Sequence, residues 1–261
     1  MYLLGDKNME GFEIYISSNG YLIIPDLNIK YLIDFNESSI PSMPEATEAT
    51  VRIAGRDGDI VLKTTYEPIS FNISCYTPDN LTLQEKTQEE AKVNQFLNGI
   101  KNTTIKLGME KDNKFYDVKY SGALTTINYP KHLKFNIPLK SSDSYAKYYQ
   151  KSTITGDATF TSNTIKEVGA KFIINGPATN FKLYLNDYEM FYESTVLEGN
   201  QLIIDSGKST VTLITPLTKS NAMRYYNHQF PKIQPGENIF RVETGISDDM
   251  QVSVEWYDLK L

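Results

Sequence analysis

Short runs in which apolar and polar residues alternate, each bounded by turn residues, extend along almost the whole chain. Because successive side chains on a strand point to opposite faces of a sheet, this period of two predicts strands with one buried face. The β-branched and aromatic residues that favour strands are dense in these runs. The fold class is therefore mainly β. The predicted strands lie near 12–16, 21–24, 70–76, 104–107, 114–120, 123–129, 134–139, 169–174, 180–185, 189–197, 201–204, 210–214, 238–243 and 251–256.

Two glycine-containing turns predict hairpins in the first third of the chain. Asn19-Gly20 precedes the apolar run that starts at Tyr21, and Asp57-Gly58 separates two β-branched runs. Glycine has no Cβ, so it accepts the positive φ that tight hairpin turns require. The stretch 36–49 contains several serines and prolines and predicts a loop or an extended arm before the second hairpin.

One helix is expected. Val93, Phe96, Leu97 and Ile100 follow the spacing i, i+3, i+4 and i+7, which places them on one face of a helix. This stripe predicts a helix over 84–98, packed on one face of a sheet. Two capping boxes have the right spacing to begin it, one at Thr82 with Glu85 and one at Thr87 with Glu90.

The chain is expected to form two domains. Its 261 residues exceed the length of one average domain, and the strand periodicity fades over 141–150. We therefore predict an N-terminal domain, 1–146, built from a β-sheet or sandwich with the single helix. The second domain, 147–261, carries many short strands at the spacing of a β-sandwich.

No catalytic, cofactor-binding or metal site is expected. His132 and His228 are isolated, and Cys75 is the single cysteine, so no familiar zinc spacing can be assembled. A Gly-x-Ser-x-Gly motif, a glycine-rich loop ending in Gly-Lys-Ser/Thr and a dinucleotide fingerprint are all absent. The closest carboxylate pairs, at 57 with 59 and at 248 with 249, fit solvated turns better than a glycosidase site.

The charge distribution argues against binding to nucleic acid. The net charge is −6, from 26 basic and 32 acidic residues, and acidic residues interrupt the most basic stretch, 101–119. Binding to phosphates requires a concentrated basic surface. No apolar run is long enough for a transmembrane helix, and the N-terminus lacks the pattern of a signal peptide, so no membrane partner is expected. The lone cysteine excludes an intramolecular disulfide and fits assembly in a reducing cytoplasm.

Two groups of residues are candidates for binding. The hairpin tip Arg56, Asp57, Gly58 and Asp59 is a candidate contact with a neighbouring subunit, because an exposed arginine suits bidentate pairing across an interface. Among the aromatic residues of the second half, Tyr184 and Tyr226 are candidates for sugar stacking, and packing in the core is the alternative.

Three features of the sequence are similar to the distal tail protein (Dit) family of bacteriophages that infect Gram-positive hosts. The first is the hairpin Ile53-Ala-Gly-Arg-Asp-Gly-Asp-Ile60. The second is the order of hairpin, strand, single helix and strands, ending at Phe135-Asn-Ile-Pro-Leu139. The third is the C-terminal pattern of Leu202-Ile-Ile-Asp205, a Pro-Gly turn at 235–236 and Val252-Ser-Val-Glu-Trp256.

The resemblance implies a structural protein of the virion tail tip. In such proteins the first domains form a hexameric ring, and a galectin-like β-sandwich follows as the second domain. The ring receives the tail tube protein on one face and the tail-associated tip protein on the other. Receptor-binding proteins or host polysaccharide are further possible partners. The alternative hypothesis is a carbohydrate-binding module that helps the particle adhere to the host cell wall, and a cell-wall hydrolase is a weaker third.

Overall fold

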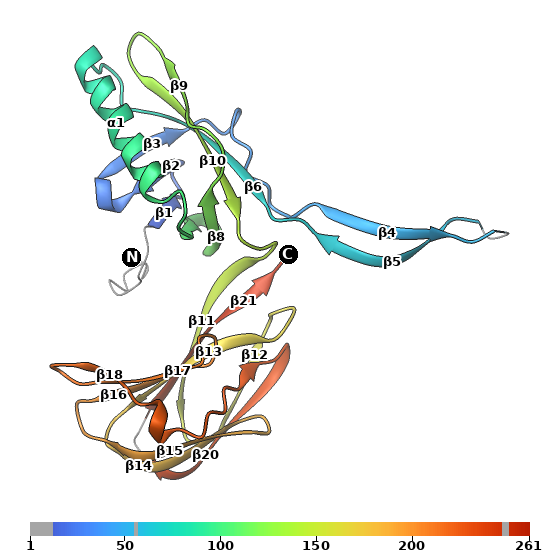
Figure 1. Cartoon of the computed structure of the whole chain (residues 1–261), viewed down its shortest axis with the longest axis vertical. Coiled ribbons are helices and arrows are strands. Elements are labelled where there is room, and N and C mark those ends of the chain that lie inside the picture. Colours follow the sequence, from blue (N-terminus) through green and yellow to red (C-terminus); the bar gives the residue numbers. More distant parts are fainter. Residues whose placement is uncertain (1–12, 55–56, 247–250) are drawn as a thin grey trace. The chain divides into compact units, whose positions relative to one another are not determined.

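The computed structural model describes residues 13–54, 57–246 and 251–261, and they form two compact units (Figure 1). The first comprises the chain up to Ala146 together with Leu261, and the second spans Lys147–Lys260. Strands dominate both units, and the described residues contain one α-helix. The predicted mainly β fold with a single helix is therefore confirmed.

The first unit is built around a barrel of seven strands, which is closed because β8 pairs with both β7 and β10. β1 and β7 are parallel, and the other neighbours in the circuit are antiparallel. The sequence predicts a β-sheet or sandwich for this domain, and it does not predict that the strands close into a barrel. Around the barrel, the strands are β1 (Glu13–Ile16), β2 (Tyr21–Ile24), β3 (Ile29–Ile33), β6 (Ser70–Tyr76), β10 (Leu133–Ser141), β8 (Lys114–Tyr120) and β7 (Ile105–Met109).

Tight turns join neighbouring barrel strands, and the turn at Asn19-Gly20 lies where the sequence predicts it. Gly20, between β1 and β2, has a φ of +80°, which glycine accepts without steric cost. Short 3₁₀ turns, η1 (Pro25–Leu27) and η2 (Glu110–Asp112), follow β2 and β7, and each ends at an asparagine in the left-handed region. A further strand, β9 (Thr125–Asn128), pairs with the first part of β10.

The helix α1 (Leu83–Gly99) begins and ends within one residue of the prediction. The Thr82 hydroxyl accepts a hydrogen bond from the backbone N–H of Glu85, and the Glu85 carboxylate accepts one from the N–H of Thr82. Thr82 with Glu85 is thus the capping box that starts the helix, whereas Thr87 lies inside it. The helix buries Val93 and Phe96 among other residues of the stripe.

The remaining part of the first unit is a separate two-stranded arm, β4 (Ala46–Arg52) and β5 (Asp59–Tyr66). It is the hairpin predicted around 55–59, and β4 begins inside the stretch 36–49 that was expected to be a loop or an extended arm.

The second unit has two sheets that share one apolar core. The phenyl rings of Phe172 on β13 and Phe240 on β20 stack across the core at 6.4 Å. Trp256 is 5% exposed, as its alternating pattern predicts. One sheet contains β18 (Lys219–Asn221), β17 (Thr210–Ile214), β16 (Gln201–Asp205), β13 (Val168–Asn175), β21 (Gln251–Lys260) and β11 (Ala146–Thr155), with β19 (Lys232–Ile233) beside β13. The other contains β12 (Ala158–Ser162), β20 (Gly236–Ile246), β14 (Ala178–Leu185) and β15 (Tyr188–Val196), and the 3₁₀ turn η3 (Met223–Tyr225) follows β18.

Candidate assembly surface

The arm formed by β4 and β5 exposes several apolar side chains to solvent. No residue of either strand is buried. Val51, Ile53, Val61 and Leu62 are 43, 48, 48 and 65% exposed. An isolated two-stranded hairpin is at best marginally stable in water. The arm therefore has the properties of an element that is completed by contact with another molecule.

The two faces of the arm differ in chemistry. Val51 lies opposite Ile60, so these two side chains share one face. Arg52 lies opposite Asp59 on the other face, which is more polar. The register shifts by one residue between the pairs Ala49–Lys63 and Thr50–Val61, so Leu62 has no direct partner on β4 and alternation does not assign it to either face. We call Val51 and Ile60 the apolar arm face.

The tip of the arm carries the candidate contact residues predicted from the sequence. Asp57 and Gly58 are exposed in the connection between the two strands, and Asp59, the first residue of β5, is exposed as well. Gly58 has a φ of +83°, and a Cβ placed there would meet nothing within 4 Å, so the backbone conformation explains this glycine. Arg56 lies outside the described residues.

Both strands of the arm are anchored to the barrel at their inner ends. Ser39 exchanges two backbone hydrogen bonds with Asn72 of β6, at 2.8 and 2.9 Å. The N–H of Glu67 donates to the carbonyl of Glu45 across the root of the arm. The Ser144 hydroxyl donates to the carbonyl of Tyr66 at 2.6 Å. These bonds fix where the arm leaves the barrel.

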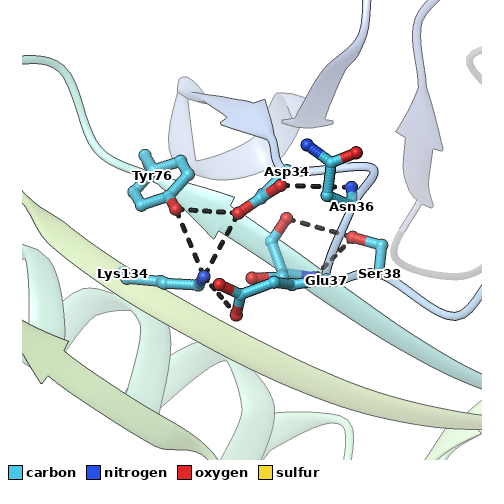
Figure 2. Close-up of polar contacts among 7 residues, drawn as sticks. Asp34, Asn36, Glu37, Ser38, Tyr76 and Lys134 are labelled. Carbon is cyan, nitrogen blue, oxygen red and sulfur yellow. Dashed lines mark hydrogen bonds and ion pairs between the residues drawn. The ribbon is translucent and has the colours of Figure 1, made fainter.

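A buried lysine holds the segment that leads from β3 to the arm (Figure 2). Lys134 of β10 is 1% exposed. Its Nζ lies 2.5 Å from a carboxylate oxygen of Glu37 and 3.2 Å from one of Asp34, and it donates to the hydroxyl oxygen of Tyr76 at 3.2 Å. The Tyr76 hydroxyl in turn donates to the same Asp34 oxygen at 2.8 Å. We call these four side chains the Lys134 cluster.

The Lys134 cluster favours the charged forms of Lys134 and Asp34. Burial opposes the charge on Lys134, but its hydrogen bonds to Glu37, Tyr76 and Asp34 outweigh burial and raise its pKa. The hydrogen bond from Tyr76 is the main cause of the lowered pKa of Asp34, and the hydrogen bond from Lys134 lowers that pKa further. The cluster is therefore an ion-pair network at neutral pH, and its role is to position the backbone over 34–38.

The sequence does not reveal this cluster, because its members come from three separated stretches of the chain. Lys134 alternates with the buried Phe135 on β10, so its pattern predicts an outward and solvated side chain. Its burial depends on Asp34 and Glu37, about 100 residues earlier. No local spacing in the sequence signals that contact.

The two tyrosines proposed to stack on sugars lie in different environments of the second unit. The expectation that Tyr226 is exposed is wrong: its ring is 3% exposed within the core, and its hydroxyl donates to the carbonyl of Gln229. Tyr184 is partly exposed. Its hydroxyl donates to Glu189 at 2.9 Å, and the guanidinium of Arg241 lies 5.2 Å from its ring centroid. Tyr226 therefore cannot stack on a sugar in this structure.

The histidines and the cysteine occupy separate positions. Nδ1 of His132 lies 3.1 Å from a carboxylate oxygen of Asp79, and His228 has a positive φ in a connection. Cys75 is fully buried, and burial raises the pKa of its thiol to about 12. Among the described residues no group of three or more His, Cys, Asp or Glu side chains is placed to hold a metal. Over the same residues, no helix has the length and apolar character needed to cross a membrane.

Comparison with known proteins identifies the fold. No protein-family model and no curated protein matches the sequence. One match is the crystal structure of the Dit protein of phage SPP1, with a TM-score of 0.63. That protein is described as a hub of the adsorption apparatus in phages that infect Gram-positive bacteria. The match covers 88% of this chain and 94% of that chain at 10% identity. The baseplate of phage P2 in its activated conformation with calcium matches with a TM-score of 0.58, covering 90% and 92% at 10% identity. The same baseplate with strontium matches with a TM-score of 0.56 over the same shares, also at 10% identity. The resemblance to distal tail proteins is thus confirmed at the level of the fold.

Proposed function

We propose that this protein is a structural subunit of a phage tail tip, a distal tail protein that forms the hub between the tail tube and the apparatus that meets the host. The likeness over 88% of this chain and 94% of the SPP1 protein carries the proposal. A β-sandwich alone occurs in many unrelated proteins and indicates little about function. A match over 88% of this chain is more specific, because it is too long to be confined to either unit.

A ring of identical subunits is the assembly that the arm favours. A closed ring with cyclic symmetry needs a head-to-tail contact, in which each subunit presents two different and complementary surfaces. The apolar arm face is suited to be one of them, because it can pack on a neighbour or extend a neighbour's sheet. Following the resemblance, we propose that six copies close the ring, with Asp57, Gly58 and Asp59, and Arg56 beside them, contributing to the contact.

The two units have separate roles in this proposal. We infer that 1–146 is the ring-forming domain and that 147–261 is a galectin-like sandwich that projects from the ring. The tail tube protein and the tail-associated tip protein are the proposed partners on the two faces of the ring, and receptor-binding proteins are further partners. The role rests on shape and contact and includes no catalysis. An aromatic sugar platform at Tyr184 and Tyr226 is not favoured, because Tyr226 is buried.

Native mass spectrometry of the purified full chain, together with negative-stain imaging, tests the proposal. We expect a mass of six copies and ring-shaped particles. Mass spectrometry of purified virions should also detect the protein in the tail fraction. A chain that stays monomeric at high concentration and is absent from virions contradicts the proposal.

A further inference from the structure

The second unit has a polar cleft at one end of its larger sheet. Three connections surround it, between β13 and β14, between β15 and β16, and between β17 and β18. Its volume of about 420 Å³ lies within the range of small-molecule sites. It is lined by Asn175, Gly176, Gly199, Asn200, Gln201, Ile214, Thr215 and Pro216.

The strands hold part of the lining in a fixed row. Asn175, Gln201 and Ile214 are direct neighbours across β13, β16 and β17, so their side chains share one face of the sheet. This face is the outer one, because the adjacent Ile174 and Leu202 are fully buried. The cleft is thus built on a sheet rather than on connections alone.

The connections are packed tightly against one another. The N–H of Gly176 donates to the carbonyl of Asn200 at 2.9 Å. A Cβ on Gly176 would lie 2.0 Å from the carbonyl oxygen of Leu197, so only glycine permits this approach. The N–H of Thr215 donates to the carbonyl of Thr218 at 2.8 Å and closes the third connection. The shape of the cleft is therefore largely preformed.

The polar groups of the cleft are uncharged. Asn175, Asn200 and Gln201 contribute amides and Thr215 contributes a hydroxyl, and no lining residue is ionisable. The Gln201 amide donates to the Asn175 side-chain oxygen at 2.9 Å. This bond orients both groups, and it leaves the Asn175 NH₂ as a donor and the Gln201 oxygen as an acceptor. Paired neutral donors and acceptors suit vicinal hydroxyl groups, whereas phosphate binding normally uses cations.

Apolar groups lie beside these amides. Ile214 and Pro216 belong to the lining. On the adjoining connections, Leu197 is 63% and Leu217 is 94% exposed. A sugar ring presents hydroxyl groups at its edge and C–H groups on its faces, so it needs both kinds of contact. We propose that this cleft binds one or two units of a neutral saccharide, such as a hexose exposed on a cell-surface polysaccharide.

This site differs from the tyrosine platform in position and in chemistry, and it does not depend on the hub function. Saturation-transfer NMR on the full chain, with glucose, galactose, rhamnose, N-acetylglucosamine and N-acetylgalactosamine as probes, tests it. We expect at least one sugar to bind. Gln201→Ala and Asn200→Ala should each weaken that binding about five- to tenfold, the loss expected when one or two hydrogen bonds are removed.

Gln229→Ala is the matched control, because it removes an exposed glutamine of the same unit outside the lining. It should leave binding unchanged, and unaltered thermal unfolding of all three variants shows that the fold is intact. Glycerol phosphate should not compete with the bound sugar. The proposal is overturned if none of the five sugars binds, or if binding is the same in Gln201→Ala as in the unsubstituted protein. If the ring forms normally but no sugar binds, the saccharide proposal fails while the proposed hub function stands.

Discussion

Lys134 and Asp34 lie 100 residues apart in the chain, yet Nζ of the lysine is 3.2 Å from the carboxylate of the aspartate. Because Lys134 belongs to the barrel wall and Asp34 begins the segment that leads to the arm, this contact joins the two. An uncompensated charge in a buried position is costly, so the pair depends on both partners.

Replacing Lys134 by alanine is expected to destabilise the first unit by about 2 to 3 kcal/mol, because Asp34 and Tyr76 then lose their buried partner. Lys134→Met keeps an apolar chain of similar length and should cost less. Urea denaturation of both variants measures the difference. Equal stability of Lys134→Ala and the unsubstituted protein would show that the cluster does not hold the segment.

The Lys134 cluster also predicts a dependence on pH. Since the folded-state pKa of Asp34 is lowered, its contribution is fully present above its unfolded pKa of about 3.9 and is lost as the pH falls through the folded value. The difference in urea midpoint between the unsubstituted protein and Asp34→Asn should be constant from about pH 5 to pH 8 and shrink below about pH 4.

Tyr76→Phe provides the control for this dependence. The tyrosine hydroxyl is the main cause of the lowered pKa of Asp34, so its removal should raise that pKa toward the ordinary value. In the Tyr76→Phe background the pH-dependent part of the Asp34→Asn effect should therefore be smaller, and its loss should be complete at a higher pH. An effect of Asp34→Asn that does not change with pH in either background contradicts the assignment.

The helix start offers a comparison between two threonines that share the same sequence pattern. Thr82→Ala removes the capping hydroxyl and should destabilise the first unit by about 1 kcal/mol. Thr87 lies inside α1, and its hydroxyl donates to the carbonyl of Leu83. Thr87→Ala should be neutral or slightly stabilising, because alanine is the better helix former. Urea denaturation of the two variants checks this order, and a larger loss for Thr87→Ala would be inconsistent with it.

Two glycines should respond in opposite directions to the same substitution. A Cβ on Gly99, at the end of α1, meets nothing within 4 Å, so Gly99→Ala should stabilise by about 0.5 to 1 kcal/mol. A Cβ on Gly169 would lie 2.4 Å from the Cα of Gly207, so Gly169→Ala should destabilise the second unit by about 2 kcal/mol. Thermal unfolding measures both shifts, and a shift of the same sign in the two variants would refute the expectation.

The elements that could be predicted from the sequence are those whose causes are local. The helix follows from an apolar stripe and a capping box within a few residues, and the arm follows from a glycine turn between two β-branched runs. Barrel closure could not be predicted in the same way, because it depends on β8 meeting β10, at Tyr120 opposite Leu139. Many strands could pair with β8 on the basis of their alternating pattern, so that pattern does not identify β10 as its partner.

The candidate site residues show the same limit. The exposed tip at Asp57 and Gly58 follows from turn chemistry, which a short stretch of sequence contains. The burial of Tyr226 follows from its bridge to Tyr192 of β15, more than 30 residues earlier, and nothing near it in the sequence indicates this. The residues of the polar cleft, such as Asn175 and Gln201, come together only through the strand register.

The apolar arm face makes a prediction that separates assembly from stability. Val51 is 43% exposed and belongs to that face, whereas Val61, which lies opposite Thr50, is 48% exposed on the other face. Val51→Asn should weaken self-association at least about tenfold, which corresponds to the loss of about 1.4 kcal/mol at an interface. It should leave the urea midpoint of the monomer nearly unchanged, because the side chain is exposed in the single chain.

Val61→Asn is the matched control for Val51→Asn, because it makes the same substitution in the neighbouring residue pair, on the opposite face of the arm. Mass photometry across a dilution series measures the dissociation of both variants. If the face defined by Val51 and Ile60 makes the contact, only Val51→Asn dissociates early. If Val61→Asn dissociates early and Val51→Asn does not, the contact lies on the polar face, with Arg52 and Asp59. If both variants keep the oligomer intact on dilution, the arm does not hold the ring together, and the head-to-tail contact must be sought on the barrel.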